Sequence, residues 1–189
     1  KKIDKLIRAF NSEIIQWDLI KNNSILIDIP MLNAIINKKT RSVLINHPHN
    51  PTGKSITNDQ LMEIIEIATR YNANIISDEV TLPLLSGKTK NFTPAANLYD
   101  KAISISSLSK LFGVPGLRFG WIVAEKRIIK KCQKLKDHIT ISNSTFSLLI
   151  GKKILENWNK ILKQNIRISD NNTQYMDEWI KNNNDWITW

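Results

Sequence analysis

Short runs of β-branched and other apolar residues alternate along the chain with longer stretches in which apolar residues recur every three or four positions. The first pattern is typical of strands and the second of amphipathic helices. Strands are expected at residues 13–17, 41–46, 74–77, 102–106 and 118–124. The run 41–46 is apolar enough to predict a strand buried on both faces. Strands that alternate with helices predict an α/β fold with a mostly parallel sheet and flanking helices.

Two helices in the first half of the chain have clear start signals. Asp28 can cap a helix that tolerates Pro30 in its first turn. The apolar face of this helix is expected to consist of Ile29, Leu32, Ile35 and Ile36. Thr57 and Gln60 have the capping-box spacing for a second helix. Its apolar residues lie at helical spacing, namely Leu61, Ile64, Ile65 and Ala68.

An irregular stretch is expected after the strand at 74–77, as far as residue 94. From residue 125 onward, after the last predicted strand, the pattern becomes helical. The first of these helices should bury one face, formed by Ile128, Ile129, Cys132 and Leu135. On this pattern Cys132 is interpreted as a packing residue. Two further helices are expected at 144–158 and 160–181. We therefore divide the chain into a main domain at residues 1–140 and a helical segment at 141–189.

Polar side chains follow three of the predicted strands. Asn50 lies in the turn-rich segment after 41–46, Asp78 follows 74–77, and Lys110 follows 102–106. Because ligands bind at the carboxyl ends of parallel strands, these three side chains are expected to converge on one site. Arg118 comes eight residues after Lys110. The sequence thus predicts a site containing an amide, a carboxylate, an amine and a guanidinium.

The segments 50–53, 77–80, 107–110 and 116–118 read Asn-Pro-Thr-Gly, Ser-Asp-Glu-Val, Ser-Leu-Ser-Lys and Gly-Leu-Arg. In order and spacing they resemble the class I/II aminotransferases of pyridoxal phosphate (PLP) fold type I. One such motif is a weak signal, whereas four in order are a strong one. The resemblance implies that 1–140 is a partial PLP-binding large domain and that 141–189 leads into a small C-terminal domain. It also implies amino-group transfer between an amino acid and a 2-oxo acid, in a homodimer.

The resemblance gives Lys110 and Asp78 the central roles. Lys110 would form a Schiff base with PLP and later carry a proton between substrate and cofactor. Asp78 would pair with the pyridine nitrogen and keep the ring protonated. Taken singly, Lys110 would be interpreted as one of 27 lysines and arginines, most of them on the surface. Asp78 alone would be interpreted as a strand-end residue that caps or turns the chain.

The remaining motif residues are assigned to cofactor binding by the same resemblance. Arg118 and Ser107 would bind the phosphate, with help from Ser109, because a guanidinium gives a permanently charged bidentate contact. Asn50 would donate a hydrogen bond to the 3′-oxygen of the cofactor and lie near the substrate carboxylate. The structural alternative is a small polar turn at the two serines and an Asn-Pro turn at Asn50.

Thr81 departs from the family pattern, which usually has tyrosine three residues after the aspartate. The threonine hydroxyl is shorter and far less acidic, so we expect altered tuning of the cofactor. This departure keeps a second function open, a PLP-dependent lyase or decarboxylase.

Two parts of the family pattern have no counterpart in this sequence. They are the N-terminal phosphate loop with its first strands, and the small-domain arginine that clamps the substrate carboxylate. A strand at 13–17 would then lack its neighbour and leave an unpaired edge. These differences keep a third interpretation open, an inactive truncated fragment or a scaffold that only binds partners.

Composition indicates which classes of partner and which cellular compartment to expect. The net charge is +10, but the dense basic stretch 126–136 is interpreted as a solvated helix face, and no nucleic-acid-binding module is visible. No apolar stretch approaches the ~20 residues that span a bilayer. The single cysteine fits a reducing compartment, so a cytoplasmic location is expected. His47 and His49 lack further ligands at a suitable spacing, so no metal site is expected.

Overall fold

The computed structural model of the chain describes residues 2–18, 20–21, 24–25, 27–82 and 93–187. Its centre is a four-stranded sheet in the order β3-β4-β5-β6. The strands are β3 (Ser42–Asn46), β4 (Asn74–Asp78), β5 (Ala102–Ser107) and β6 (Gly120–Val123). β3, β4 and β5 run parallel, and β6 runs antiparallel to β5. The mostly parallel sheet expected from the sequence is thereby confirmed.

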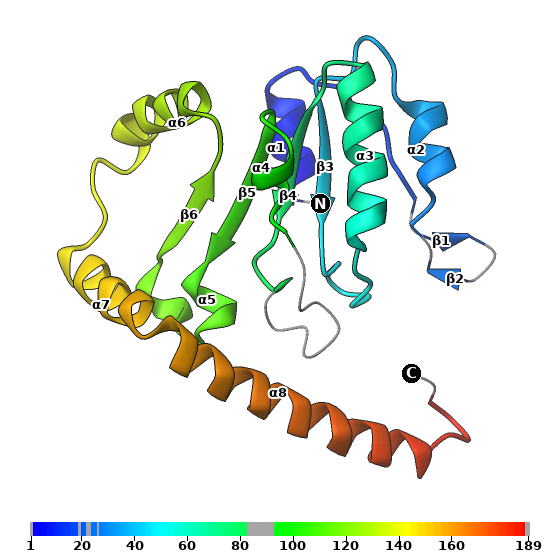
Figure 1. Cartoon of the computed structure of the whole chain (residues 1–189), viewed down its shortest axis with the longest axis vertical. Helices are drawn as coiled ribbons and strands as arrows, with labels where there is room; N and C mark the ends of the chain where they lie inside the picture. Colours follow the sequence, from blue (N-terminus) through cyan, green and yellow to red (C-terminus); the bar gives the residue numbers. More distant parts are fainter. Residues whose placement is uncertain (1, 19, 22–23, 26, 83–92, 188–189) are drawn as a thin grey trace.

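Helices surround this sheet (Figure 1). They are α1 (Lys2–Ala9), α2 (Ile29–Ile35), α3 (Asn58–Arg70), α4 (Ala95–Leu98), α5 (Leu108–Leu111), the 3-10 helix η2 (Pro115–Leu117), α6 (Lys126–Ile139), α7 (Thr145–Glu156) and α8 (Trp158–Lys181). A small antiparallel pair, β1 (Ile20–Lys21) with β2 (Ser24–Ile25), precedes α2. α2 and α3 lie side by side, and α8 runs past the end of the sheet at which β3, β4 and β5 finish (Figure 1).

The start signals of α2 and α3 act as the sequence predicts. Asp28 accepts a hydrogen bond from the Met31 amide at 2.9 Å. Thr57 and Gln60 form the reciprocal capping box at the start of α3. The predicted apolar face of α3 is buried and joins the main core with residues of α2, β3 and β4. The two helices therefore cover one face of the sheet and fix its position.

The opposite face of β3 is more open than expected. Val43 and Ile45 are buried, whereas Leu44 between them is 43% exposed. The prediction of a strand buried on both faces is therefore wrong. Side chains alternate between the two faces of a strand, and only the face toward α2 and α3 is covered here by described residues.

Residues 13–17 do not form the expected strand; within the described ranges they have no regular secondary structure. The side chain of Trp17 instead packs against the main core. Its indole nitrogen donates to the Asp28 carbonyl at 2.8 Å. A short apolar run becomes a strand only where another strand pairs with it, and this run meets the N-terminal end of a helix instead.

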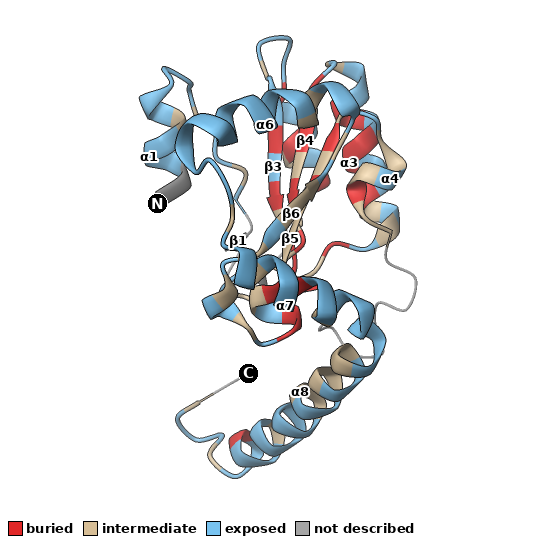
Figure 2. Cartoon of the chain, turned by 90° about the vertical axis from the view of Figure 1, so that its left-hand side faces the viewer, coloured by how far each residue is buried: buried red, intermediate tan, exposed pale blue. Residues whose placement is uncertain are grey.

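The C-terminal helices are much more exposed than the sheet (Figure 2). In α6, Ile128 and Ile129 are half-buried, but Cys132 and Leu135 are exposed. The interpretation of Cys132 as a packing residue is therefore wrong, because no described element covers the second half of α6. No described helix combines the length and apolarity that a membrane span needs. Of the stretch expected to be irregular, 83–92 lies outside the described residues.

Candidate functional site

The carboxyl ends of three adjacent strands meet at one edge of the sheet. The register pairs Asn46 of β3 with Asp78 of β4, and Asp78 with Ile105 of β5. β5 continues two residues further, to Ser107, which pairs with Gly120 of the antiparallel β6. The segments that follow β3, β4 and β5, and the segment that precedes β6, therefore start from this edge. It is the position at which α/β folds bind ligands.

Lys110 is presented at this edge by the short helix α5. Leu108 and Leu111 are buried and anchor the helix in a second apolar cluster, whereas Lys110 is exposed. Ser107 caps the helix, and its Oγ accepts a hydrogen bond from the Ser109 amide at 3.3 Å. Ser107, Ser109 and Lys110 thus belong to one small structural unit. The buried side chains of Leu108 and Leu111 hold this unit in place.

Asp78 is the last residue of β4 and is half-buried. Its Oδ1 accepts a hydrogen bond from the Val80 amide at 3.2 Å, which orients one carboxylate oxygen along the turn that follows. Thr81 is half-buried in that turn, three residues beyond Asp78. A carboxylate with one oxygen fixed in this way can still accept a proton or a hydrogen bond at the other.

Arg118 ends η2 and lies two residues before β6, so it belongs to the same edge. Its backbone is left-handed, with φ 51°. This conformation costs a side chain other than glycine roughly 1–2 kcal/mol. The Nη1 donates to the Pro115 carbonyl at 2.7 Å, and the side chain is otherwise exposed. Backbone strain is common at functional sites, and an exposed guanidinium can bind an anion through two hydrogen bonds.

Asn50 lies in the loop after β3. The backbone amide of Asn50 donates a hydrogen bond to Asn46 Oδ1 at 3.0 Å, and the side chain of Asn50 is exposed. The loop closes through hydrogen bonds from the Gly53 amide to the His49 carbonyl and from the His49 amide to the Lys54 carbonyl, both at 2.7 Å. Gly53 has φ +67°, which glycine adopts without strain. The loop therefore holds Asn50 at the edge without burying it.

The topology brings all the predicted residues to one edge but does not join them to one another. In the part of the chain that the structure describes, no hydrogen bond or ion pair links Lys110, Asp78 and Arg118. The three carry an amine, a carboxylate and a guanidinium, and with two serine hydroxyls they can bind a phosphate and exchange a proton with a small organic molecule. This donor set fits a phosphorylated pyridine aldehyde.

Sequence reasoning missed a buried polar layer behind this edge. It consists of His47, Ser77, Glu79 and Ser104. His47 Nε2 lies 3.2 Å from Ser77 Oγ, and burial lowers the pKa of His47 from 6.5 to about 4. The signal that could have found it is polar residues at alternate positions of otherwise apolar strands.

Asn165 of α8 was also missed. Its Nδ2 donates to the Leu111 carbonyl at 2.8 Å and so ties α8 to the end of α5. Nothing in the local sequence distinguishes Asn165 from the other asparagines of this helix, because the contact depends on how α8 packs.

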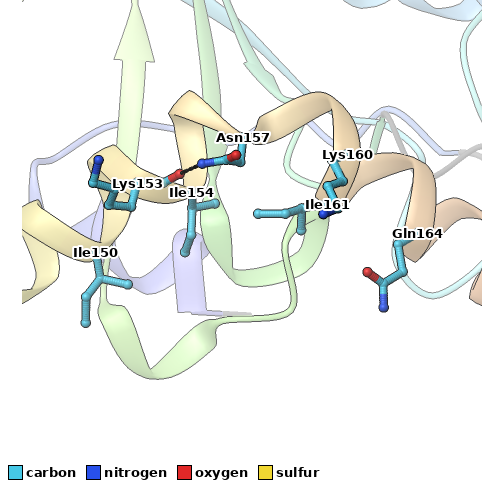
Figure 3. Close-up of a pocket in the computed structure, with 7 residues that line it drawn as sticks. All are labelled: Ile150, Lys153, Ile154, Asn157, Lys160, Ile161 and Gln164. Carbon is cyan, nitrogen blue, oxygen red and sulfur yellow. Dashed lines mark hydrogen bonds between the residues drawn. The ribbon is translucent and has the colours of Figure 1, made fainter.

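A hollow of about 350 Å³ is lined by residues of α7 and α8 (Figure 3). Its lining residues are Ile150, Lys153, Ile154, Asn157, Lys160, Ile161 and Gln164. Asn157 Nδ2 donates to the Lys153 carbonyl at 2.9 Å within it. The lining holds no carboxylate, and Lys153 is already paired with Glu156. The strand-end edge is therefore the stronger candidate. The described residues also contain no group of three side chains suited to a metal ion.

Comparison with known proteins agrees with this geometry. The capreomycidine synthase of Streptomyces vinaceus is 25% identical over 174 residues, which are 92% of this chain and 44% of the relative. An aspartate aminotransferase of Pyrococcus horikoshii is 31% identical over 144 residues, covering 75% of this chain and 37% of the relative. The crystal structure of a PLP-dependent aminotransferase from Streptococcus suis has a TM-score of 0.87 at 30% identity, covering 94% of this chain and 46% of that one.

The chain thus spans less than half the length of each of these proteins. The sequence model of one family, aminotransferase class I and II, matches residues 1–187. With the strand-end site on the same fold as the aminotransferase from Streptococcus suis, this match shows that the chain belongs to the class I and II aminotransferase family.

Proposed function

We propose that this chain is the PLP-binding core of an aminotransferase that transfers an amino group between an amino acid and a 2-oxo acid. The observation that carries the proposal is the placement of Lys110, Asp78 and Arg118 at one strand-end edge in a member of this family. The bound cofactor would supply an electron sink that stabilises negative charge on the substrate carbon. Binding and orientation of the cofactor and the transfer of protons must come from the side chains of the protein.

Each side chain has a distinct task in this proposal. Asp78 holds a proton at the ring nitrogen, since a carboxylate next to that atom favours its charged form. Arg118, Ser107 and Ser109 bind the phosphate and fix its direction. Asn50 and Thr81 would hold the ring oxygen, to which the side-chain amide of Asn50 would donate a hydrogen bond. Contacts at the phosphate, the ring nitrogen and the ring oxygen would together orient the ring.

Lys110 Nζ would attach the cofactor covalently and later move the proton at the substrate carbon. Its position supports both tasks. The helix α5 is anchored by Leu108 and Leu111, so the lysine stem starts from a fixed point while its amine remains accessible. A mobile surface lysine would lose this advantage, because misplacement of about 1 Å can cost ~100-fold in rate.

The organisation of the complete protein follows from the same proposal. Residues 1–140 belong to the large domain, and 141–189, with α7 and α8, lead into a small domain. We place the protein in the cytoplasm, which its single cysteine supports, and we propose that it forms a homodimer.

Reduction with borohydride after incubation with PLP tests the proposal, with peptide mass spectrometry to locate the adduct. We expect a pyridoxyl group on Lys110 in the wild-type chain and none on that peptide in Lys110→Ala. Lys131→Ala, on the exposed part of α6, is the matched control and should keep the Lys110 adduct. Adducts scattered over surface lysines, or none, would instead support the interpretation as an inactive fragment.

A second function rests on two observations, namely Thr81 in place of tyrosine and the similarity to a synthase. Both are compatible with a PLP enzyme that changes its amino acid without transferring the amino group, and Thr81 is the feature of this chain that suggests a lyase or decarboxylase. The discriminating measurement is the yield of aminated cofactor (pyridoxamine phosphate) in a single turnover without added 2-oxo acid, because transfer leaves the amino group on the cofactor, whereas a lyase or decarboxylase returns the cofactor as PLP. A yield near one supports transfer, and a yield near zero with a changed amino acid supports the second function. Thr81→Tyr should raise the yield only if Thr81 is responsible.

A further inference from the structure

Two adjacent carboxylates at the end of β4 point in opposite directions. Side chains alternate along a strand, and Ile75, Ser77 and Glu79 are buried on one face, whereas Ile76 and Asp78 are half-buried on the other. The Glu79 amide donates to the Ile105 carbonyl at 2.9 Å, so the ladder with β5 continues past Asp78. Asp78 therefore belongs to the candidate site, and Glu79 to the protein interior.

The Glu79 side chain joins three elements. Its Oε1 accepts hydrogen bonds from Ser104 Oγ of β5 at 2.9 Å and from the Ala95 amide of α4 at 3.0 Å. Ser104 Oγ in turn accepts from the Ala96 amide at 3.0 Å. Glu79 is 5% exposed and Ser104 is 4% exposed. The end of β4 is thereby tied to the neighbouring strand and to the first turn of α4.

Both of these partners of Glu79 are neutral groups, a serine hydroxyl and a backbone amide. Burying a carboxylate costs free energy unless hydrogen bonds compensate, and removing its partners leaves the cost uncompensated. A leucine or methionine would fill the same space without this cost.

We propose that Glu79 is a positioning residue, whose buried carboxylate holds the end of β4 against β5 and α4 so that the Asp78 carboxylate keeps its direction toward the cofactor. The inference rests on the proposed function for its consequence, but its structural part is independent of PLP. The Val80 amide reports directly on Asp78, because it donates to Asp78 Oδ1. Its hydrogen exchange measures how firmly the carboxylate is held.

Four variants of the full chain separate positioning from simple loss of stability. Glu79→Ala removes the acceptor, and Ser104→Ala removes one donor and provides a milder test if Glu79→Ala does not fold. Glu79→Gln keeps an acceptor oxygen and should rescue both readouts. Leu61→Ala, in the core face of α3, is the matched control, because Leu61 is fully buried but has no part in this network.

Two quantities are measured on each folded variant, the Kd for PLP by absorbance titration and the exchange rate of the Val80 amide. Glu79→Ala should raise the Kd about tenfold or more and accelerate Val80 exchange by a similar factor. Glu79→Gln and Leu61→Ala should stay within about threefold of wild type in both.

Each outcome decides the inference. It is overturned if Leu61→Ala matches Glu79→Ala, or if Val80 exchange in Glu79→Ala and Ser104→Ala equals that of wild type. If the wild-type chain binds no PLP, the proposed function fails, and Val80 exchange alone then supports or overturns the positioning role.

Discussion

At the scale of single residues, the candidate site combines a strained backbone with side chains that have few partners. Arg118 adopts a left-handed conformation, and within the described residues the one hydrogen bond of its guanidinium is to a backbone carbonyl. Such strain persists where the surrounding structure enforces it and is typical of functional positions. A substitution at Arg118 that relieves the strain should therefore raise the free energy of unfolding while it weakens ligand binding.

Arg118→Gly tests this opposition. Glycine adopts the left-handed region freely, so we expect the free energy of unfolding to rise by roughly 0.5–1 kcal/mol. The affinity for PLP should nevertheless fall, by about tenfold or more, because a charged phosphate contact is lost. Urea denaturation and absorbance titration measure the two effects. Arg127→Gly, in exposed α6, is the control and should lower stability by about 1 kcal/mol without changing PLP affinity.

His47 gives the stability of the protein a pH dependence. Burial lowers its pKa to about 4, whereas in the unfolded chain it titrates near 6.5. Between these values the unfolded state binds more protons, so the free energy of unfolding should fall as the pH drops from 6.5 to 4. The loss attributable to His47 should reach roughly 3 kcal/mol.

Urea denaturation across this pH range checks the contribution of His47. His47→Gln should flatten the dependence, while His138→Gln, in the exposed end of α6, should leave it unchanged. A wild-type profile with the same slope as that of His47→Gln would contradict the assignment.

At the scale of elements, the helices differ in what fixes them. α3 is held by its capping box and by a buried apolar face. α7 is instead held by close approach to the segment before β6. A Cβ added at Gly151 would lie 2.7 Å from the Phe119 ring, next to Arg118. Glycine therefore allows α7 to approach this closely, even though it is a poor helix former.

Gly151→Ala follows from that contact. Alanine gains about 1 kcal/mol of helix propensity, but the overlap with the Phe119 ring costs roughly 1–3 kcal/mol. We expect a net loss of stability of about 1 kcal/mol, measured by urea denaturation. The double variant with Phe119→Leu should recover the loss, because the flat ring is removed. A stabilised Gly151→Ala would show that α7 does not pack so closely.

Thr57→Ala probes the start of α3. Loss of the capping box should lower the free energy of unfolding by about 1 kcal/mol. Thr57→Ser keeps the hydroxyl and should retain most of that energy. Equal stability of the two variants in thermal or urea denaturation would indicate that the box contributes nothing.

At the scale of the whole molecule, burial is unevenly distributed. The sheet and α3 hold the main core, whereas α6, α7 and the segment between them are mostly exposed (Figure 2). Their exposed large apolar side chains include Ile139, Ile141, Phe146 and Leu149. Exposed apolar side chains on neighbouring segments of this kind favour contact with another protein surface.

The 189-residue chain should therefore associate through this surface in solution. Replacing Phe146 and Leu149 together by serine should reduce association in sedimentation experiments and the binding of apolar dyes. The free energy of unfolding should change by less than about 0.5 kcal/mol, because both side chains are exposed. Replacing Leu44 by serine, on the open face of β3, is the control. Unchanged association in the double variant would exclude this surface.

Sequence reasoning predicted the fold well where local and periodic signals agree. The capping residues Asp28 and Thr57 and the apolar face of α3 confirm this. It was wrong at residues 13–17, at Leu44 and at Cys132. In each case the missing information was the neighbour, since an apolar run does not specify whether another strand or helix will cover it.

The sequence by itself determined the α/β order, the helix starts and the candidate residues Asn50, Asp78, Lys110 and Arg118, because these depend on spacing and on side-chain chemistry. Only the tertiary structure decided that Glu79 is tied to Ser104, that Asn165 holds α5, and that Gly151 meets Phe119. These pairs lie 25, 54 and 32 positions apart along the chain. Contacts at such separations depend on how strands register and helices pack, and no local pattern encodes them.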